Sequence, residues 1–185
     1  MDALSLLLGR NSAAKLCEPA PAGEALDTIF QAALRAPDHA RLRPWRFLTV
    51  AADARYALGD IFADALGERN PQATAEELDK ARNKTLRAPL LVIVVVNFQE
   101  HPKVPYIEQQ LSAGCAAHAM LLAAHAQGFA GIWRTGANAF DRRVMDTLGL
   151  AVNEEIVGFL YLGTVDGRYK PLPDLAIADY VQEWK

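Results

Sequence analysis

The sequence has few cysteines and no long apolar run, and both absences narrow the class of protein. Its 185 residues include two cysteines, Cys17 and Cys115, which lie far apart and form no Cys-x-x-Cys pair. Isolated thiols are typical of a reducing compartment, although spacing alone does not decide whether they pair. The N-terminal apolar stretch is too short for a signal peptide, and the longest apolar run, residues 90–96, is too short to cross a membrane. We therefore expect a cytoplasmic protein that does not enter a membrane.

The charge balance excludes another group of functions. Charged residues make up 22% of the chain and the net charge is −3, so no strong basic face for nucleic acid is expected. Hydrophobic residues make up 51%, slightly above the usual range, which predicts spare apolar surface and hence an oligomer. The length fits one domain, residues 1–185, which buries roughly two-thirds of its unfolded surface without help from a metal or disulfide.

Several catalytic motifs are also missing. Neither the dinucleotide fingerprint G-x-G-x-x-G nor the phosphate loop G-x-x-x-x-G-K-[ST] occurs. Ser12-Ala-Ala-Lys15 matches the S-x-x-K of serine acyl-enzymes, but the companion S-D-N and K-T-G segments are absent, so this hypothesis is weak. His118 and His125 share a helix face with no acid between them, which favours core or interface histidines over a metal site. We expect no metal.

Hydrophobic periodicity predicts alternating helices and strands. Pro37 ends one helix, and Thr74 with Glu77 forms a capping box that opens another. The alternation is uneven, which favours an α/β or α+β sandwich with helices on both faces of a mixed, mainly antiparallel sheet of four to five strands. Helices are predicted at residues 3–9, 23–35, 53–66, 74–87, 107–127 and 141–149, and strands at residues 46–51, 90–97, 131–135 and 155–163.

Three segments carry residues suited to a planar, anionic ligand. Residues 126–136 hold three glycines, which allow close backbone approach, beside Trp133. Arg10-Asn-Ser12 places a guanidinium next to a hydroxyl, and residues 35–43 contain three arginines and a histidine. Arginine forks bind phosphate through charge-assisted hydrogen bonds. The alternative interpretation is that these arginines form ordinary solvated surface.

Taken in order, these segments resemble the nitroreductase family of FMN-dependent oxidoreductases. Arg10-Asn-Ser12 is similar to the family's Arg-Arg-Ser, and Ala36-Pro-Asp-His-Ala-Arg-Leu-Arg-Pro-Trp45 is similar to its A-P-S-x-x-N-x-Q-P-W. The third piece is Ala126-Gln-Gly-Phe-Ala-Gly-Ile-Trp133, similar to its glycine-rich segment. The short, single-domain bacterial branch resembles this chain most.

The resemblance implies an intertwined homodimer with FMN at the interface. By position, Arg10, Asn11 and Ser12 would hold the phosphate and ribityl end, with further contacts from Arg168 and Lys170 left open. Arg35 and His39 would reach the flavin from the neighbouring subunit, and Gly131, Ile132 and Trp133 would lie along the isoalloxazine ring. No catalytic side chain is implied, because the chemistry belongs to the flavin.

Some positions depart from the family pattern. Asn11 replaces the usual second arginine, and Ala14 stands where a basic residue is common, with Lys15 one place later. Arg41 and Arg43 replace common Asn and Gln residues. The charge of Arg43 suggests a preference for anionic substrates.

The resemblance predicts an oxidoreductase that passes hydride from NAD(P)H through FMN to an acceptor such as a nitroaromatic or quinone. The alternative is a flavin-binding dimeric protein with little or no turnover, because a fold does not fix a function. The choice between NADH and NADPH is left open, as is the physiological acceptor.

Overall fold

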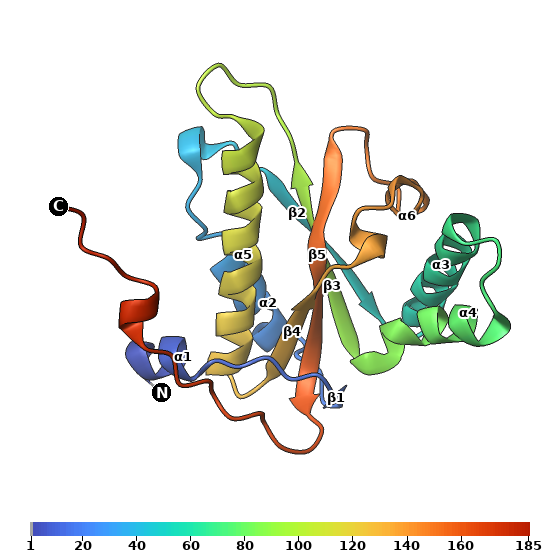
Figure 1. Cartoon of the computed structure of the whole chain (residues 1–185), viewed down its shortest axis with the longest axis horizontal. Helices are drawn as coiled ribbons and strands as arrows, with labels where there is room; N and C mark the ends of the chain where they lie inside the picture. Colours follow the sequence, from blue (N-terminus) through green and yellow to red (C-terminus); the bar gives the residue numbers. More distant parts are fainter. Residues whose placement is uncertain (1) are drawn as a thin grey trace.

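The computed structural model describes residues 2–185, so Met1, which the expected domain includes, lies outside the described residues. The chain forms helices and strands close to the predicted positions (Figure 1). The helices are α1 (Ala3–Gly9), α2 (Glu24–Ala33), α3 (Ala54–Arg69), α4 (Ala75–Arg82), α5 (Tyr106–Ala126) and α6 (Arg142–Thr147), and the short 3₁₀ turns are η1 (His39–Arg41), η2 (Asn83–Arg87), η3 (Ala137–Ala139) and η4 (Ile177–Asp179). The strands are β1 (Leu16–Cys17), β2 (Trp45–Ala51), β3 (Leu90–Asn97), β4 (Ala130–Arg134) and β5 (Glu154–Val165).

The five strands form one sheet centred on β5, which confirms the expected α+β sandwich. Strand β5 pairs with β3 on one side and with β4 and β1 on the other, and β2 pairs with β3. Every described pairing is antiparallel, so the mixed strand directions expected from the sequence are not found. The reason is that β5 inserts between β3 and β4, which run in the same direction and would otherwise form a parallel pair joined by α5.

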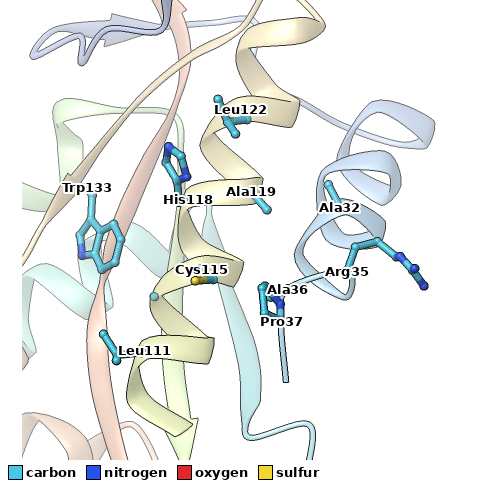
Figure 2. A pocket seen from close by; sticks show the side chains of 11 residues that line it. Ala32, Arg35, Ala36, Pro37, Leu111, Cys115, His118, Ala119, Leu122 and Trp133 are labelled. Carbon is cyan, nitrogen blue, oxygen red and sulfur yellow. The ribbon is translucent and has the colours of Figure 1, made fainter. Parts of the chain in front are cut away.

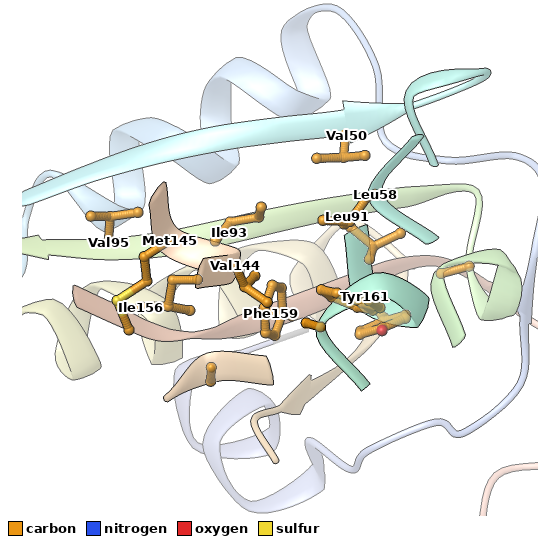
Figure 3. Packing of buried hydrophobic residues seen from close by; sticks show 14 of the residues in the cluster. Val50, Leu58, Leu91, Ile93, Val95, Val144, Met145, Ile156, Phe159 and Tyr161 are labelled. Atoms are coloured by element: carbon orange, nitrogen blue, oxygen red, sulfur yellow. The ribbon is translucent and has the colours of Figure 1, made fainter. Parts of the chain in front are cut away.

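Strand β3 is buried on both faces, as its continuous run of Val, Ile and Leu predicts. Alternate residues contribute to two hydrophobic clusters. Leu91, Ile93 and Val95 pack with α3 and α6 residues (Figure 3), whereas Val92 and Val94 pack with α2 and α5 residues. The sheet therefore separates an α3/α6 side from an α2/α5 side.

Strand β5 contains a bulge beside the predicted site. Gly158 pairs with Val94, and Ile156 pairs with Val95, so Val157 is an extra residue without a partner on β3. On the opposite edge, β4 pairs with β5 only from Phe159 onward. Residues 154–158 of β5 therefore have no neighbouring strand on that edge.

Helix α5 is lined with small residues where it lies against α2 and the sheet. Ala113, Ala116, Ala117 and Ala124 are buried, which allows the close approach that the alanine-rich sequence predicts. Other α5 side chains stay exposed, among them Leu111 and Ile107. No helix within residues 2–185 has the length and apolar character needed to cross a membrane.

The C-terminal segment leaves the body of the molecule. Residues 166–185 run beneath the sheet, pass α1 and extend outward (Figure 1). Large apolar side chains on this tail stay in solvent, including Ile177, Tyr180 and Trp184, which is 97% exposed. Together with exposed Leu4, Leu7 and Leu8 of α1, they leave apolar surface that the described chain does not cover.

Candidate functional site

Strand β4 presents different residues to the two sides of the sheet. Ile132 packs on the α3/α6 cluster, and the guanidinium of Arg134 lies 5.7 Å from the ring centroid of Tyr161, a member of that cluster. Trp133 packs on the α2/α5 cluster. The alternation of a strand thus divides the predicted segment between two sides of the molecule.

A cavity of about 520 Å³ opens beside β4, and we call it the β4 cavity. It lies between β4 and η3 on one side and α3 and η2 on the other. Four of its lining side chains are basic: Arg69, Lys84, Arg87 and Arg134. Burial and the neighbouring charges of Arg87 and Arg69 lower the pKa of Lys84. The cavity therefore concentrates positive charge.

Three of these four basic side chains form no ion pair in the described part of the chain. Arg69 pairs with Asp141, but Lys84, Arg87 and Arg134 form no ion pair within residues 2–185. In the same described part of the chain, Nε of Arg134 is buried and has no hydrogen-bond partner. A buried donor without an acceptor costs free energy, roughly 1–3 kcal/mol. The cavity is thus suited to an anionic ligand that accepts hydrogen bonds.

The glycine of β4 lies in a tightly packed place. A Cβ on Gly131 would lie 2.7 Å from Leu121 Cδ2 and 2.8 Å from Leu162 Cδ2. Gly131 is therefore needed for close packing of β4 against α5 and β5. Gly136, with φ of 75° and open space around it, lines the β4 cavity and permits the turn there.

Trp133 fills the gap between α5 and the sheet. Its Nε1 donates to the carbonyl oxygen of Val157 at 3.3 Å, so the extra carbonyl of the β5 bulge gains a partner. Gly114 on α5 and Gly158 on β5 leave room for the indole. Trp133 lines both the β4 cavity and an apolar groove of about 490 Å³ on the α5 side (Figure 2).

The predicted phosphate segment lies beside β4. The backbone N–H of Ala13 donates to the carbonyl of Gly131 at 3.2 Å, and Nδ2 of Asn11 donates to the carbonyl of Lys170 at 2.7 Å. The structure therefore brings the Arg10–Ser12 segment, the start of β4 and the C-terminal segment at Lys170 together. A smaller cavity, whose charged lining residues are Lys15, Arg87, Arg134 and Asp166, adjoins the β4 cavity through the two arginines.

Arg35 and His39 are not brought to this place within one chain. Arg35 follows α2, and His39 of η1 contacts Glu108, with 2.7 Å between Nδ1 and Oε2. Glu108 is near the N-terminal end of α5, whereas α1 lies near its C-terminal end (Figure 1). Because α5 has 21 residues, the two ends are roughly 30 Å apart at about 1.5 Å per residue.

Sequence reasoning missed most of the β4 cavity. From the sequence, Lys84 and Arg87 fall in a predicted helix, Arg69 in the loop before it and Arg134 in a predicted strand, and none of them is given a role in a site. The alternation of side chains along a strand could have pointed to Arg134, because it lies two residues after Ile132 and so faces the same side of the sheet. Cys17 and Cys115 are both exposed and unpaired in the part of the chain described, residues 2–185.

The chain is similar in sequence and fold to known proteins. A family profile described as "Nitroreductase family" matches residues 10–164. The chain is 47% identical over 166 residues to "Putative NAD(P)H nitroreductase YdjA" from Escherichia coli (strain K12), covering 89% of this chain and 88% of that protein. A solved nitroreductase-like family protein from Bacillus cereus is similar, with a TM-score of 0.84 and 20% identity, over 100% of this chain and 96% of that chain. A solved nitroreductase with bound FMN from Bacteroides fragilis NCTC 9343 has a TM-score of 0.73 and 20% identity, over 100% of both chains.

Proposed function

The chain belongs to the nitroreductase family, and on this premise we propose that residues 1–185 form one cytoplasmic, FMN-dependent oxidoreductase domain. It takes hydride from NAD(P)H and passes it to a small acceptor such as a nitroaromatic or a quinone. The name of the E. coli relative supports the donor. The FMN bound to the B. fragilis relative supports the cofactor.

The unpartnered Nε of Arg134 in the β4 cavity is the observation that carries this proposal. FMN carries hydrogen-bond acceptors and an anionic phosphate, so it fits a cavity whose cations lack partners. The volume of about 520 Å³ falls within the usual range for small-molecule sites, roughly 300–1,000 Å³. The residues present therefore suit a flavin.

The side chains have distinct proposed roles. When bound, the flavin accepts hydride from the donor and delivers it to the acceptor. Lys84, Arg87 and Arg134 stabilise the negative charge of the reduced ring by Coulomb attraction in a partly buried site. Gly131, Ile132 and Trp133 form the wall beside the ring.

The anionic end of the cofactor requires separate contacts. In our proposal, Arg10, Asn11 and Ser12 bind the phosphate and ribityl chain. Lys15 lines the adjoining cavity and supplies the basic group that Ala14 lacks. No protein side chain has to act as a general base, because hydride transfer to and from the flavin is the chemical step.

A second copy of the chain completes the site in this proposal. His39 contacts Glu108, near the end of α5 remote from the Arg10–Ser12 segment, and the Arg35 guanidinium is directed away from α5. In this proposal both residues therefore reach a flavin across a two-fold interface. The exposed apolar tail and α1 support such an interface, since a monomer would leave them in water. In this dimer, the C-terminal residues 166–185 pack against the surface of the second copy.

The oligomeric state is directly measurable. We expect a mass of about twice the 20.2 kDa of one chain by light scattering at micromolar concentration. Replacing Ile177 and Trp184 with serine removes apolar surface from the tail and should shift the protein toward monomer. A monodisperse monomer of the unaltered chain that still binds FMN stoichiometrically would contradict the shared site.

Removing the charge of Arg134 should weaken cofactor binding. Hydrogen bonds to charged groups contribute roughly 1.5–3 kcal/mol, so Arg134→Gln should raise the Kd for FMN about tenfold or more at about 1.4 kcal/mol per decade. A fluorescence titration of the apoprotein measures this. Arg143→Gln is the control, because Arg143 is exposed on α6 and pairs with Glu68 away from the cavity. Equal FMN affinity in both variants would exclude Arg134 from the site.

Turnover separates the proposal from its alternative, a flavin-binding dimer without activity. Rapid mixing of the FMN-loaded protein with NADH or NADPH should bleach the flavin absorbance within seconds, and adding a quinone should restore it. Binding of FMN without bleaching by either nucleotide would favour the alternative. Failure to bind FMN at all would contradict both the oxidoreductase and the inactive flavin-binding dimer.

A further inference from the structure

The loop between α2 and β2 has an unusual backbone. Ala40, Arg41 and Arg43 have φ values of 62°, 56° and 50°, in the left-handed region that L-residues rarely adopt. The carboxylate of Asp38 holds the loop, since Oδ1 accepts from the backbone N–H of Leu42 at 3.2 Å and Oδ2 accepts from that of Arg43 at 2.7 Å. Such strain persists where surrounding contacts enforce it, often at functional positions.

Contacts from other elements also fix the loop. Nε2 of Gln99 donates to the carbonyl of Leu42 at 2.7 Å, and the loop residue His39 contacts Glu108 of α5. The loop is thus anchored to the segment after β3 and to α5. It presents the side chains of Arg41 and Arg43 from a rigid support.

The side chains of three arginines meet at this loop. Arg35, Arg41 and Arg43 line a cavity of about 230 Å³, together with Leu34, Ala36, Asp38 and Trp45. Throughout residues 2–185, none of these three guanidinium groups takes part in a side-chain hydrogen bond or ion pair, whereas Arg46, Arg82 and Arg142 are all paired. Both oxygens of Asp38, the one acid in the lining, are already occupied by backbone donors. The cavity therefore has free donors and excess positive charge.

The size of the cavity selects the ligand. A volume of about 230 Å³ is less than half that of the β4 cavity, which suits a phosphate group and part of its sugar better than a whole dinucleotide. Arginine forks match the geometry of phosphate oxygens. A phosphate monoester on a longer ligand is the chemistry that fits.

The location connects this cavity with the flavin site. Arg35 and Ala36 also line the groove that reaches Trp133, and Figure 2 shows the Arg35 guanidinium directed away from α5. The proposed function already brings the loop of one copy to the flavin of the other. If the distal end of a nucleotide bound at that flavin extends to this loop, Arg41 and Arg43 are placed to contact its phosphate.

We propose that Arg41 and Arg43, with Arg35 at the rim, form a phosphate-monoester site that binds the 2′-phosphate of NADPH. This inference rests on the proposed function, since it assigns the electron donor of the same site. NADH lacks that phosphate, so the three arginines would leave the enzyme with a preference for NADPH.

A charge-removing double variant tests the donor preference. The double variant Arg41→Asn with Arg43→Gln removes two charges and leaves Arg35 in place. Arg143→Gln, which removes one charge away from this loop, is the control. We expect kcat/KM for NADPH to fall at least tenfold, mainly through a higher KM, while kcat/KM for NADH and the Kd for FMN stay within twofold. Equal losses with both nucleotides would overturn the proposal.

A binding measurement does not depend on turnover. Calorimetry should show that the unaltered protein binds 2′,5′-ADP at least tenfold more tightly than 5′-AMP, and that the double variant loses this difference. Equal binding of the two nucleotides would overturn the proposal even if the protein proves to be an active nitroreductase. If the protein has no reductase activity but discriminates the nucleotides, the phosphate site stands and the proposed function fails.

Two further measurements show whether the arginines bind the 2′-phosphate of NADPH, a free anion or an anionic acceptor. If inorganic phosphate binds as tightly as 2′,5′-ADP, the cavity is a free-anion site and the assignment to NADPH is wrong. If the double variant changes KM only for an anionic acceptor, such as nitrobenzoate compared with nitrobenzene, the arginines serve the acceptor and the assignment is also wrong.

Discussion

Gly158→Ala is expected to damage both the fold and the flavin site. A Cβ at this position would overlap Nε1 of Trp133 and lie 2.6 Å from its Cδ1. The indole would have to leave its place and lose its bond to the Val157 carbonyl. Overfilling a core costs roughly 1–3 kcal/mol and the hydrogen bond about 1 kcal/mol, so the free energy of unfolding should fall by about 3 kcal/mol.

Chemical denaturation and FMN titration measure the two effects of Gly158→Ala. Displacement of Trp133 disturbs the wall shared by the two cavities, so we expect FMN affinity to fall at least tenfold. Gly67→Ala is the control, because its added Cβ would only touch Leu78 Cδ2 at 3.8 Å and alanine favours the helix. A Gly158→Ala protein as stable as the control would show that the tryptophan is free to move.

Glu154→Gln should produce a loss of stability of similar size. Glu154 is 5% exposed, and its carboxylate accepts two hydrogen bonds from Arg46, at 2.5 and 2.7 Å, and one from the backbone N–H of Ala151 at 2.9 Å. These contacts tie β2 to β5 across β3. Breaking a buried pair costs about 3–5 kcal/mol, but the Arg46 side chain is 36% exposed, so we expect a loss of about 2–3 kcal/mol.

The same pair makes stability depend on pH with a defined sign. Hydrogen bonds from Arg46 hold the pKa of Glu154 below its ordinary value of 4.5. A carboxyl whose pKa is lowered by folding stabilises the native state above its unfolded pKa, and loses this contribution as the pH falls toward the folded value. The stability gap between the unaltered protein and Glu154→Gln should therefore shrink below about pH 4.5, whereas exposed Glu155→Gln should show no gap. A gap constant from pH 7 to pH 3 would contradict this.

Most elements of the fold were predictable because their signals are local. The buried run of β3, the proline after α2 and the capping box of Thr74 and Glu77 each mark an element where the structure has it. Strand β1 was missed because Leu16 and Cys17 become a strand only through pairing with β5. The all-antiparallel sheet was missed because strand order depends on contacts distant in sequence.

The site was predicted less completely for the same reason. Sequence order suggested the Arg10–Ser12 segment and β4, which the structure places side by side. Lys84 and Arg87 come from η2, more than 40 residues before β4 in the chain, and no local pattern links them to Arg134. The predicted roles of Arg35 and His39 in flavin binding stay predictions, since they depend on a second copy of the chain.

The unpaired edge of β5 has a consequence for solubility. Bare strand edges can recruit other chains and start aggregation. Here the Trp133 indole occupies the Val157 carbonyl, and Nη1 of Arg142 donates to the Glu154 carbonyl at 3.2 Å. Two side chains thus occupy backbone acceptors in the stretch where β4 stops short, so fewer of them are free to pair with a strand of another chain.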